Sequence, residues 1–299
     1  MNGKILVGIG RILIALVFTP LHAIMIWLFL TKKEYRTHTS FHIMASLGIV
    51  DCLHLVANFV TGLMTIFYTN MNIIIERVTG ALLMSCWVGM GCMIIILALN
   101  RMVVLMSVKF ATMNEKTIFN GLLGLSWILV AANTGLHLTD DGAVDFSLFA
   151  ASFTYRNTLF NNNLGNCESH SILLLLLLSL ICYVGIVLWI LLNKSFKTTY
   201  VKIERHELRI LMQAIIIFTY MAALRCLWQF GAPIYLKYFF VIDILNIVNC
   251  LIGAVNPVIY LVFNGSIRGH FVQMLQLQKV MTIKKKKVKV TVISVQSLS

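Results

Sequence analysis

Charged residues and prolines are scarce in this sequence. Only 12% of its 299 residues are Asp, Glu, Lys or Arg, only three are proline, and no Gly/Ser-rich or long polar segment divides the chain. The apolar share is 59%, whereas soluble globular domains have about 45–50%. We therefore exclude a soluble globule and expect one membrane domain over residues 1–278, followed by a basic tail over residues 279–299.

Long apolar runs make up most of what is present. A helix needs about 20 apolar residues to cross a bilayer, and lipid offers no hydrogen-bond partner to an open backbone. Seven such windows can be drawn, at residues 8–30, 41–67, 78–105, 118–138, 170–193, 209–230 and 239–263. The sequence predicts an all-α fold, a seven-transmembrane helix bundle with a short amphipathic helix after helix seven.

Acidic residues are rarer than basic ones, because 11 Asp and Glu stand against 24 Lys and Arg. Eighteen of the 24 basic residues lie in the segments after the first, third, fifth and seventh windows or, like Arg101 and Arg209, in the window ends that border these segments. Short loops rich in Lys and Arg stay on the cytoplasmic side, so we expect a multi-pass protein of the plasma membrane with its amino terminus outside and its carboxyl terminus inside. This topology accounts for the net charge of +13, and we expect no nucleic-acid binding.

The segment after the seventh window has an apolar stripe followed by a basic run. Ile267, Phe271, Met274 and Leu275 recur at helical spacing, which predicts a helix lying on the membrane surface. The basic run comprises Lys284, Lys285, Lys286, Lys287 and Lys289. Each such charge contributes about 1 kcal/mol to binding near an anionic bilayer. We expect the tail to bind anionic lipid, and a solvated tail that only fixes topology is a compatible alternative.

Two polar residues inside the windows suggest an internal site. Asp51 lies in the second window, and Asn256 precedes Pro257 in the seventh. Polar groups inside a membrane are costly unless they are paired or face a cavity, and Pro257 frees one backbone carbonyl at a helix kink. Asp51 and Asn256 could meet through water or a sodium ion, or each could cap local backbone; both interpretations stay open here.

The third window has an asparagine and an arginine near its end, Asn100 and Arg101 in "ILALNRM". Arginine costs several kcal/mol at the centre of a bilayer. Arg101 therefore marks the cytoplasmic exit of the helix, where its side chain reaches the lipid headgroups, or has a specific function there.

These motifs carry a resemblance to a known family. "LGIVD", "LALNR", Trp127 and "NPVIY" resemble a seven-transmembrane G-protein-coupled receptor. "FHIMASLGIVD", "TGLM", the spacing from Gly80 to Trp87, "ELRILMQAIII" and "IYLVFNGSIR" resemble the nematode serpentine chemoreceptors, best their Srt class and next their Srx class. The resemblance covers residues from about 10 to 271. It implies a chemosensory receptor that binds a small molecule and signals through a heterotrimeric G protein.

The resemblance also implies a switch around Arg101. In such receptors this arginine engages the G protein, and Tyr260 would turn toward it on activation. Its usual acidic neighbour is replaced by Asn100, which carries no charge and cannot form an ionic latch. Glu204 or Glu207, at the foot of helix six, could pair with Arg101 instead.

Several residues in the outer halves of the helices are candidates for a ligand pocket. Arg225 in helix six and Asp243 in helix seven are the only charges that face a plausible pocket. The candidate lining residues are Trp87, Arg225, Trp228, Asp243, Asn246 and Asn249. An Arg225–Asp243 pair that only closes the bundle is the alternative to ligand contact. We expect a small, apolar or weakly charged ligand.

Other classes of function have weaker signals. A transporter or channel is the alternative to a receptor, but such proteins more often show repeated broken helices or chains of intramembrane charges. The pairs His38–His42 and Asp51–His54 lack the further histidine motifs of a diiron or zinc hydrolase. We therefore expect no enzyme activity, no metal centre and no cofactor.

Overall fold

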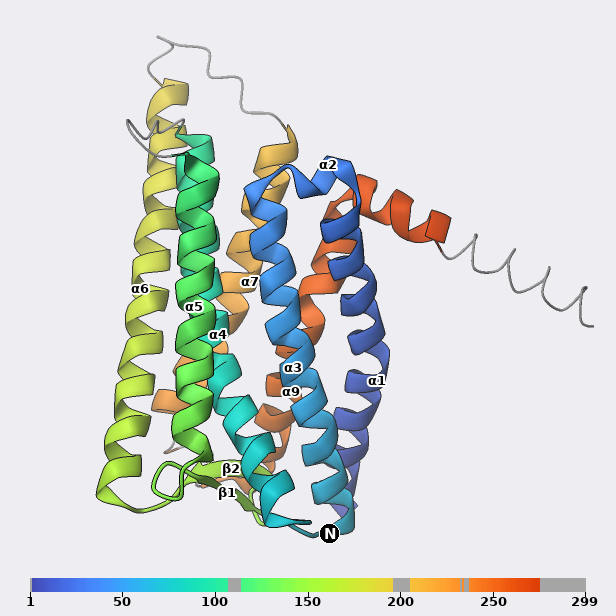
Figure 1. Cartoon of the computed structure of the whole chain (residues 1–299), viewed down its shortest axis with the longest axis vertical. Helices are drawn as coiled ribbons and strands as arrows, with labels where there is room; N and C mark the ends of the chain where they lie inside the picture. Colours follow the sequence, from blue (N-terminus) through green and yellow to red (C-terminus); the bar gives the residue numbers. More distant parts are fainter. Residues whose placement is uncertain (1, 107–113, 196–204, 232, 234–236, 275–299) are drawn as a thin grey trace, which may run out of the picture. The chain divides into compact units, whose positions relative to one another are not determined.

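The computed structural model describes residues 2–106, 114–195, 205–231, 233 and 237–274 (Figure 1). The chain divides into two compact units, and the boundary falls directly after Pro257, inside the last long helix. A proline within a helix removes one backbone hydrogen bond. The boundary therefore coincides with a point where this helix lacks part of its own bonding.

Helices make up nearly all of the described chain, with one short antiparallel hairpin. The elements are α1 Asn2–Thr31, α2 Lys33–Arg36, α3 Thr39–Phe67, α4 Ile73–Leu105, α5 Glu115–Leu138, β1 Val144–Ser147, β2 Ser152–Tyr155, α6 Leu159–Ser195, α7 Arg205–Phe230 and α9 Phe239–Phe263. Seven of the described helices are long and apolar enough to cross a membrane. The predicted all-α seven-helix bundle is confirmed.

The predicted windows agree with the carboxyl-terminal ends of these helices within two residues, but six of the seven start too late, the exception being the window at 239–263. Capping explains two of the starts. The Asn72 side chain accepts a hydrogen bond from the Ile74 amide (2.8 Å), and Asn114 accepts one from the Lys116 amide (3.0 Å), so α4 and α5 each begin one residue after a cap. The first turns of α6, from Leu159, are polar and lie outside any apolar window.

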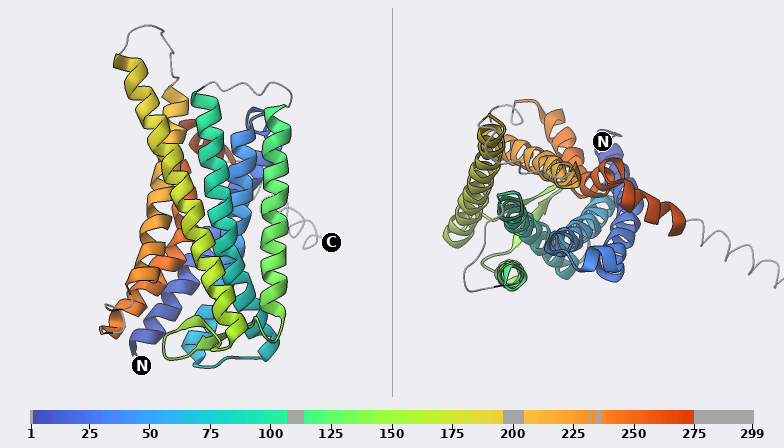
Figure 2. Two further views of the ribbon diagram at one scale, coloured as in Figure 1. Left: turned by 90° about the vertical axis from the view of Figure 1, so that its left-hand side faces the viewer. Right: turned by 90° about the horizontal axis from the view of Figure 1, so that it is seen from above.

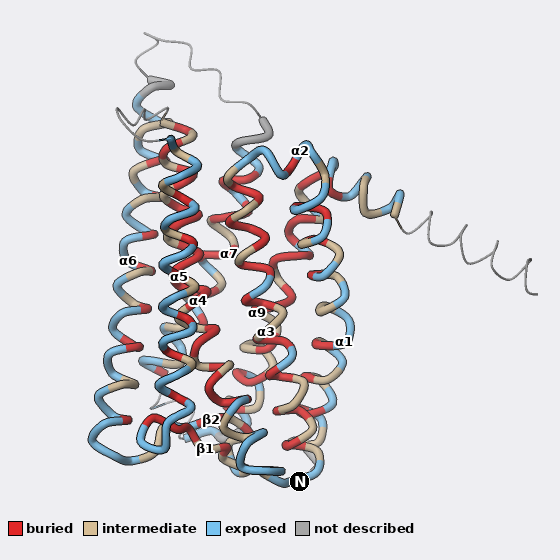
Figure 3. Tube along the Cα trace, in the orientation of Figure 1, coloured by how far each residue is buried: buried red, intermediate tan, exposed pale blue. Residues whose placement is uncertain are grey.

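Helix α4 is the centre of the first unit. It packs against α3, α5, α6 and α7, and 72% of its apolar window is buried, against 22% for α5 and 28% for α1 and α6 (Figures 2 and 3). The outer helices present apolar side chains outward instead, such as Leu177, Ile181 and Leu188 of α6, which are all more than half exposed. Such an outward apolar face suits lipid rather than water.

The hairpin lies at one end of the bundle, which we call the hairpin end (Figure 1). Helix α2 lies at the opposite end, which we call the α2 end. The two strands pair with Val144 opposite Tyr155 and Ser147 opposite Ser152. Buried side chains under the hairpin form one apolar cluster, namely Ala57, Met64, Leu83, Val144, Phe146 and Phe153.

A glycine on α4 allows the hairpin to approach so closely. A Cβ atom at Gly80 would lie 2.9 Å from the Phe153 ring and would also overlap the Val144 side chain. Any larger residue at this position would push the hairpin away from the helix, because packed interiors leave little free volume.

The second unit holds the last turns of α9 and a short helix over residues 265–274. The Asn264 side chain caps this helix by accepting hydrogen bonds from the amides of Ser266 (3.1 Å) and Ile267 (3.2 Å). Ile267 is buried and Phe271 and Met274 are half-buried, whereas most intervening positions are exposed. The short helix thus has the predicted apolar stripe, while Leu275 and the basic run from Lys284 to Lys289 lie outside the described residues.

Candidate functional site

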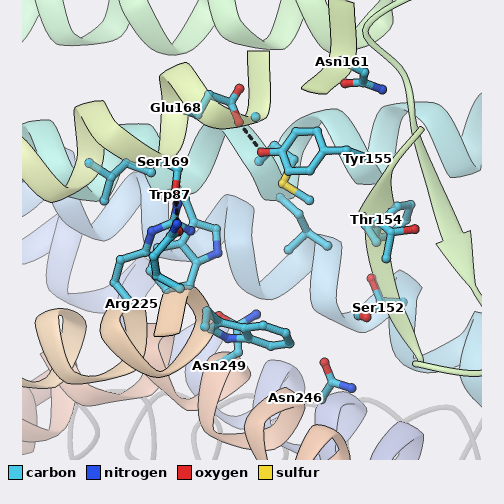
Figure 4. Close-up of a pocket in the computed structure, with 18 of the residues that line it drawn as sticks. Trp87, Ser152, Thr154, Tyr155, Asn161, Glu168, Ser169, Arg225, Asn246 and Asn249 are labelled. Atoms are coloured by element: carbon cyan, nitrogen blue, oxygen red, sulfur yellow. Dashed lines mark hydrogen bonds between the residues drawn. The ribbon is translucent and has the colours of Figure 1, made fainter. Parts of the chain in front are cut away.

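A cavity of about 670 Å³ lies at the hairpin end, bounded by six helices and strand β2. Its size falls within the ~300–1,000 Å³ of small-molecule sites. Amide side chains dominate its polar lining, namely Asn58, Asn161, Asn162, Asn166, Gln229, Asn246 and Asn249, and aromatic rings of Trp87, Phe153, Tyr155 and Trp228 supply much of the rest. Figure 4 shows these side chains converging from different elements.

The structure brings together five of the six residues predicted for a ligand pocket. Trp87, Arg225, Trp228, Asn246 and Asn249 all line the cavity. Asp243 does not, because its carboxylate pairs with the Lys4 ammonium of α1 (2.6 Å). The Arg225–Asp243 pair considered from the sequence is therefore not formed, and whether the lining binds a ligand stays a prediction.

Arg225 has polar and aromatic contacts in place of an acidic partner. Its Nη2 donates to the Ser169 hydroxyl (2.7 Å), and the Ser169 hydroxyl donates in turn to the Gln229 side chain. The guanidinium carbon lies 5.8 Å from the centre of the Trp87 ring, within the range of a cation–π contact.

Glu168 is a cavity residue that the sequence did not single out. One carboxylate oxygen is 2.7 Å from Nε2 of His137, whose other ring nitrogen lies 2.7 Å from the Gly142 carbonyl. The other oxygen accepts a hydrogen bond from the Tyr155 hydroxyl (Figure 4). Burial, with the Glu168 charge beside it, raises the pKa of Tyr155, so the phenol stays protonated and donates. Both Glu168 oxygens are thus occupied.

Two buried side chains anchor the turn of the hairpin over the cavity. Arg11 of α1 donates to the Ala151 carbonyl (2.7 Å), and Asn246 of α9 donates to the Ala150 carbonyl (2.8 Å). Ala151 has a positive φ of 50°, a conformation that aligns the turn carbonyls with these donors and that alanine adopts at some cost. The hairpin is therefore held by helices distant from it in sequence.

The two intramembrane polar residues meet near the middle of the bundle. The Asn256 amide donates directly to the Asp51 carboxylate, so no bridging atom is needed between them. The imidazole of His22, from α1, faces the same carboxylate, and its Nε2 is 3.8 Å from Asp51 Oδ2. The same nitrogen also contacts the Gly253 carbonyl. These neighbours of His22 come from α3 and α9. A water or sodium site at Asp51 and Asn256 stays a prediction.

Arg101 lies buried at the α2 end in a small hydrogen-bond network, with 1% of its surface exposed. It donates to the Ser40 hydroxyl of α3 and to the Asn100 side-chain oxygen (2.7 Å). Ser40 also donates to that oxygen (2.8 Å), while the Asn100 amide donates to the Glu115 carboxylate of α5 (3.3 Å). Buried guanidinium groups need such partners.

Glu115, which the sequence did not predict, contributes an acid to this network. Glu204 lies outside the described residues, as does the side chain of Glu207. Tyr260 belongs to the second unit, so its movement toward Arg101 stays a prediction. In the described part of the chain, no group of three or more His, Cys, Asp or Glu residues is arranged to hold a metal ion.

Comparisons with known proteins agree with this architecture. Residues 1–285 match the family described as "Serpentine type 7TM GPCR chemoreceptor Srt". The fold is similar to the crystal structure of squid rhodopsin, with a TM-score of 0.74 and 16% sequence identity over 92% of this chain and 85% of that chain. No curated protein matches the sequence.

Proposed function

Because this chain belongs to the Srt family of serpentine seven-transmembrane G-protein-coupled chemoreceptors, we propose that it binds a small molecule in the cavity and activates a heterotrimeric G protein through the Arg101 end. Members of this family are receptors rather than enzymes, and the family favours a receptor over the transporter or channel considered from the sequence. The observation that carries the proposal is the separation of two polar centres. The cavity is at the hairpin end, and the buried Arg101 network is at the α2 end.

The distribution of charge supports an orientation in which the hairpin end faces outside the cell. Eighteen of the 24 basic residues lie in the segments after the first, third, fifth and seventh spans or in the helix ends that border these segments, and short basic loops stay in the cytoplasm. In this orientation the cavity is accessible to external chemicals and Arg101 to a G protein. We place the receptor in the plasma membrane, with the basic tail from Lys284 to Lys289 on anionic lipid of the inner leaflet.

The Arg101 network supports a resting state in which residues of α3, α4 and α5 hold the guanidinium together. Arg101 is held by Ser40 and Asn100, and Asn100 is oriented by Glu115. Activation would release the guanidinium from this network, and a G protein would then compete for it. The Asn100 amide relays the contact from Arg101 to an acid on another helix, Glu115 of α5.

The test is to express the full chain with a panel of Gα chimeras and to screen small molecules for a response. Arg101→Ala should lower the response at least tenfold while surface expression stays unchanged. Arg156→Ala is the matched control, because it removes a half-exposed arginine of the hairpin that pairs with Asp145. A response that survives Arg101→Ala at full strength contradicts the role of Arg101. A compound that purified receptor binds but that activates none of the Gα chimeras contradicts G-protein coupling.

A further inference from the structure

The charges that line the cavity are unequal. Two arginines, Arg11 and Arg225, face one carboxylate, Glu168. A charged side chain within a membrane span is costly unless it has a partner or serves a function. A charge that has no direct partner within the protein therefore indicates the sign of the ligand charge that the cavity can bind.

Glu168 and Arg11 are already engaged. The Glu168 carboxylate contacts His137 through one oxygen and Tyr155 through the other, so each of its oxygens already has a partner within the protein. Nε of Arg11 also lacks a hydrogen-bond partner, but Arg11 is 2% exposed, whereas Arg225 is half-buried, and Arg11 donates to the Ala151 carbonyl, where it holds the hairpin. Its role is structural.

Arg225 retains binding capacity. Its contacts to the described residues are the hydrogen bond from Nη2 to Ser169 and the packing against Trp87, and Nε is buried without a hydrogen-bond partner. No described acidic side chain lies within ion-pair distance of its guanidinium. Arginine stays charged at physiological pH and presents a planar fork of donors that matches a carboxylate.

We propose that the ligand of this receptor is a small carboxylic acid whose carboxylate pairs with Arg225 and whose apolar or aromatic body packs beside Trp87 and Trp228. This proposal rests on the cavity being the ligand site of the proposed receptor. The carboxylate supplies the direct ion-pair partner that Arg225 lacks among the described residues, since the Glu168 carboxylate of the same cavity is bonded to His137 and Tyr155. The indole rings offer apolar surface for the body of the ligand, and the cavity amides accept or donate hydrogen bonds to any further polar group.

Matched probes test the charge directly. Phenylacetate, 4-phenylbutyrate and octanoate are each compared with the corresponding primary amide, for affinity to the purified full-length receptor at pH 7. These carboxylates are ionised at that pH, and each amide differs little from its acid in shape. We expect at least one acid to bind at least tenfold more tightly than its amide. Equal affinities for all three pairs, or no binding by any of the acids, would overturn the proposal without recourse to a variant.

Variants then assign the preference to Arg225. Arg225→Gln should reduce the acid preference to less than twofold while amide affinity stays within threefold, and Arg225→Lys should keep part of the preference because it keeps the charge. Arg77→Gln is the matched control: it removes an arginine at the same end that pairs with Asp140 and does not line the cavity. An acid preference that survives Arg225→Gln, or that Arg77→Gln abolishes, contradicts the proposal.

A parallel signalling assay separates this proposal from the proposed function. Neutral probes that bind and activate a Gα chimera, while the acids do neither, would reject the carboxylate and support the receptor. Acid binding that depends on Arg225 but activates no Gα chimera would support the carboxylate and reject the coupling.

Discussion

Replacing Glu115 by alanine should raise the ligand-independent activity of this receptor. The Glu115 carboxylate accepts the hydrogen bond from Asn100 that orients the Asn100 amide, and the oxygen of the same amide accepts from Arg101 and Ser40. Without the carboxylate, the amide can rotate away from Arg101. The guanidinium then loses one of its partners in the resting arrangement.

The geometry sets the size of the effect. A hydrogen bond to a charged group contributes a net ~1.5–3 kcal/mol. The Asn100–Glu115 bond is long, at 3.3 Å, and only partly buried, so we take the lower end, about 1.5 kcal/mol. If the bond exists only in the resting state, its loss shifts the resting-to-active ratio about tenfold, since 1.4 kcal/mol corresponds to a factor of ten. Glu115→Gln, which keeps a neutral acceptor, should give a smaller rise.

The assay is basal G-protein activation without ligand, normalised to receptor at the cell surface. Glu34→Ala is the matched control, because Glu34 is an exposed acid of α2 and its removal changes the net charge equally. Basal activity of Glu115→Ala within twofold of the unaltered receptor, at normal surface expression, would refute the proposed resting network. An equal rise in Glu34→Ala would assign the effect to charge alone.

Three further predictions concern other parts of the molecule. Gly80→Val should destabilise the receptor by about 1–3 kcal/mol through overpacking under the hairpin, seen as a lower melting temperature of purified receptor; an unchanged melting temperature would show that the hairpin does not seat there. Tyr155→Phe should cost about 1–2 kcal/mol by leaving one Glu168 oxygen without its donor, measured by the same melt, and stability equal to the unaltered receptor contradicts that bond. Asp51→Asn should change the agonist response more than surface expression, because it alters the contact with Asn256; equal losses of both would indicate a folding role.

Much of the fold could be predicted because the bilayer constrains each segment separately. A span needs about 20 apolar residues whatever its neighbours are, so the windows and their carboxyl-terminal ends are recognisable one at a time. The starts of the helices were less predictable. Helix α6 begins at Leu159 with polar turns that no hydropathy window detects, and these turns carry Asn161 and Glu168 into the cavity wall.

The candidate site was predictable only where a side chain is unusual in its own segment. Arg225 and Asn246 stand out in apolar helices, and both line the cavity. Glu168 lies in a polar stretch and gave no such signal. Asp243 did stand out, but its partner is Lys4, and nothing within the seventh span indicates a lysine at the far end of the sequence.

The sequence by itself determined the membrane class, the seven spans and the position of Arg101 at the end of the third, because each depends on the cost of placing a polar or apolar residue in lipid. Only the tertiary structure decided the partners. Asp51 meets His22 as well as Asn256, Arg101 is held through Asn100 by Glu115, and Arg225 lies in the cavity with no described acid at ion-pair distance. These pairings join residues from different helices, and side-chain contacts of a few ångströms depend on how the helices pack together.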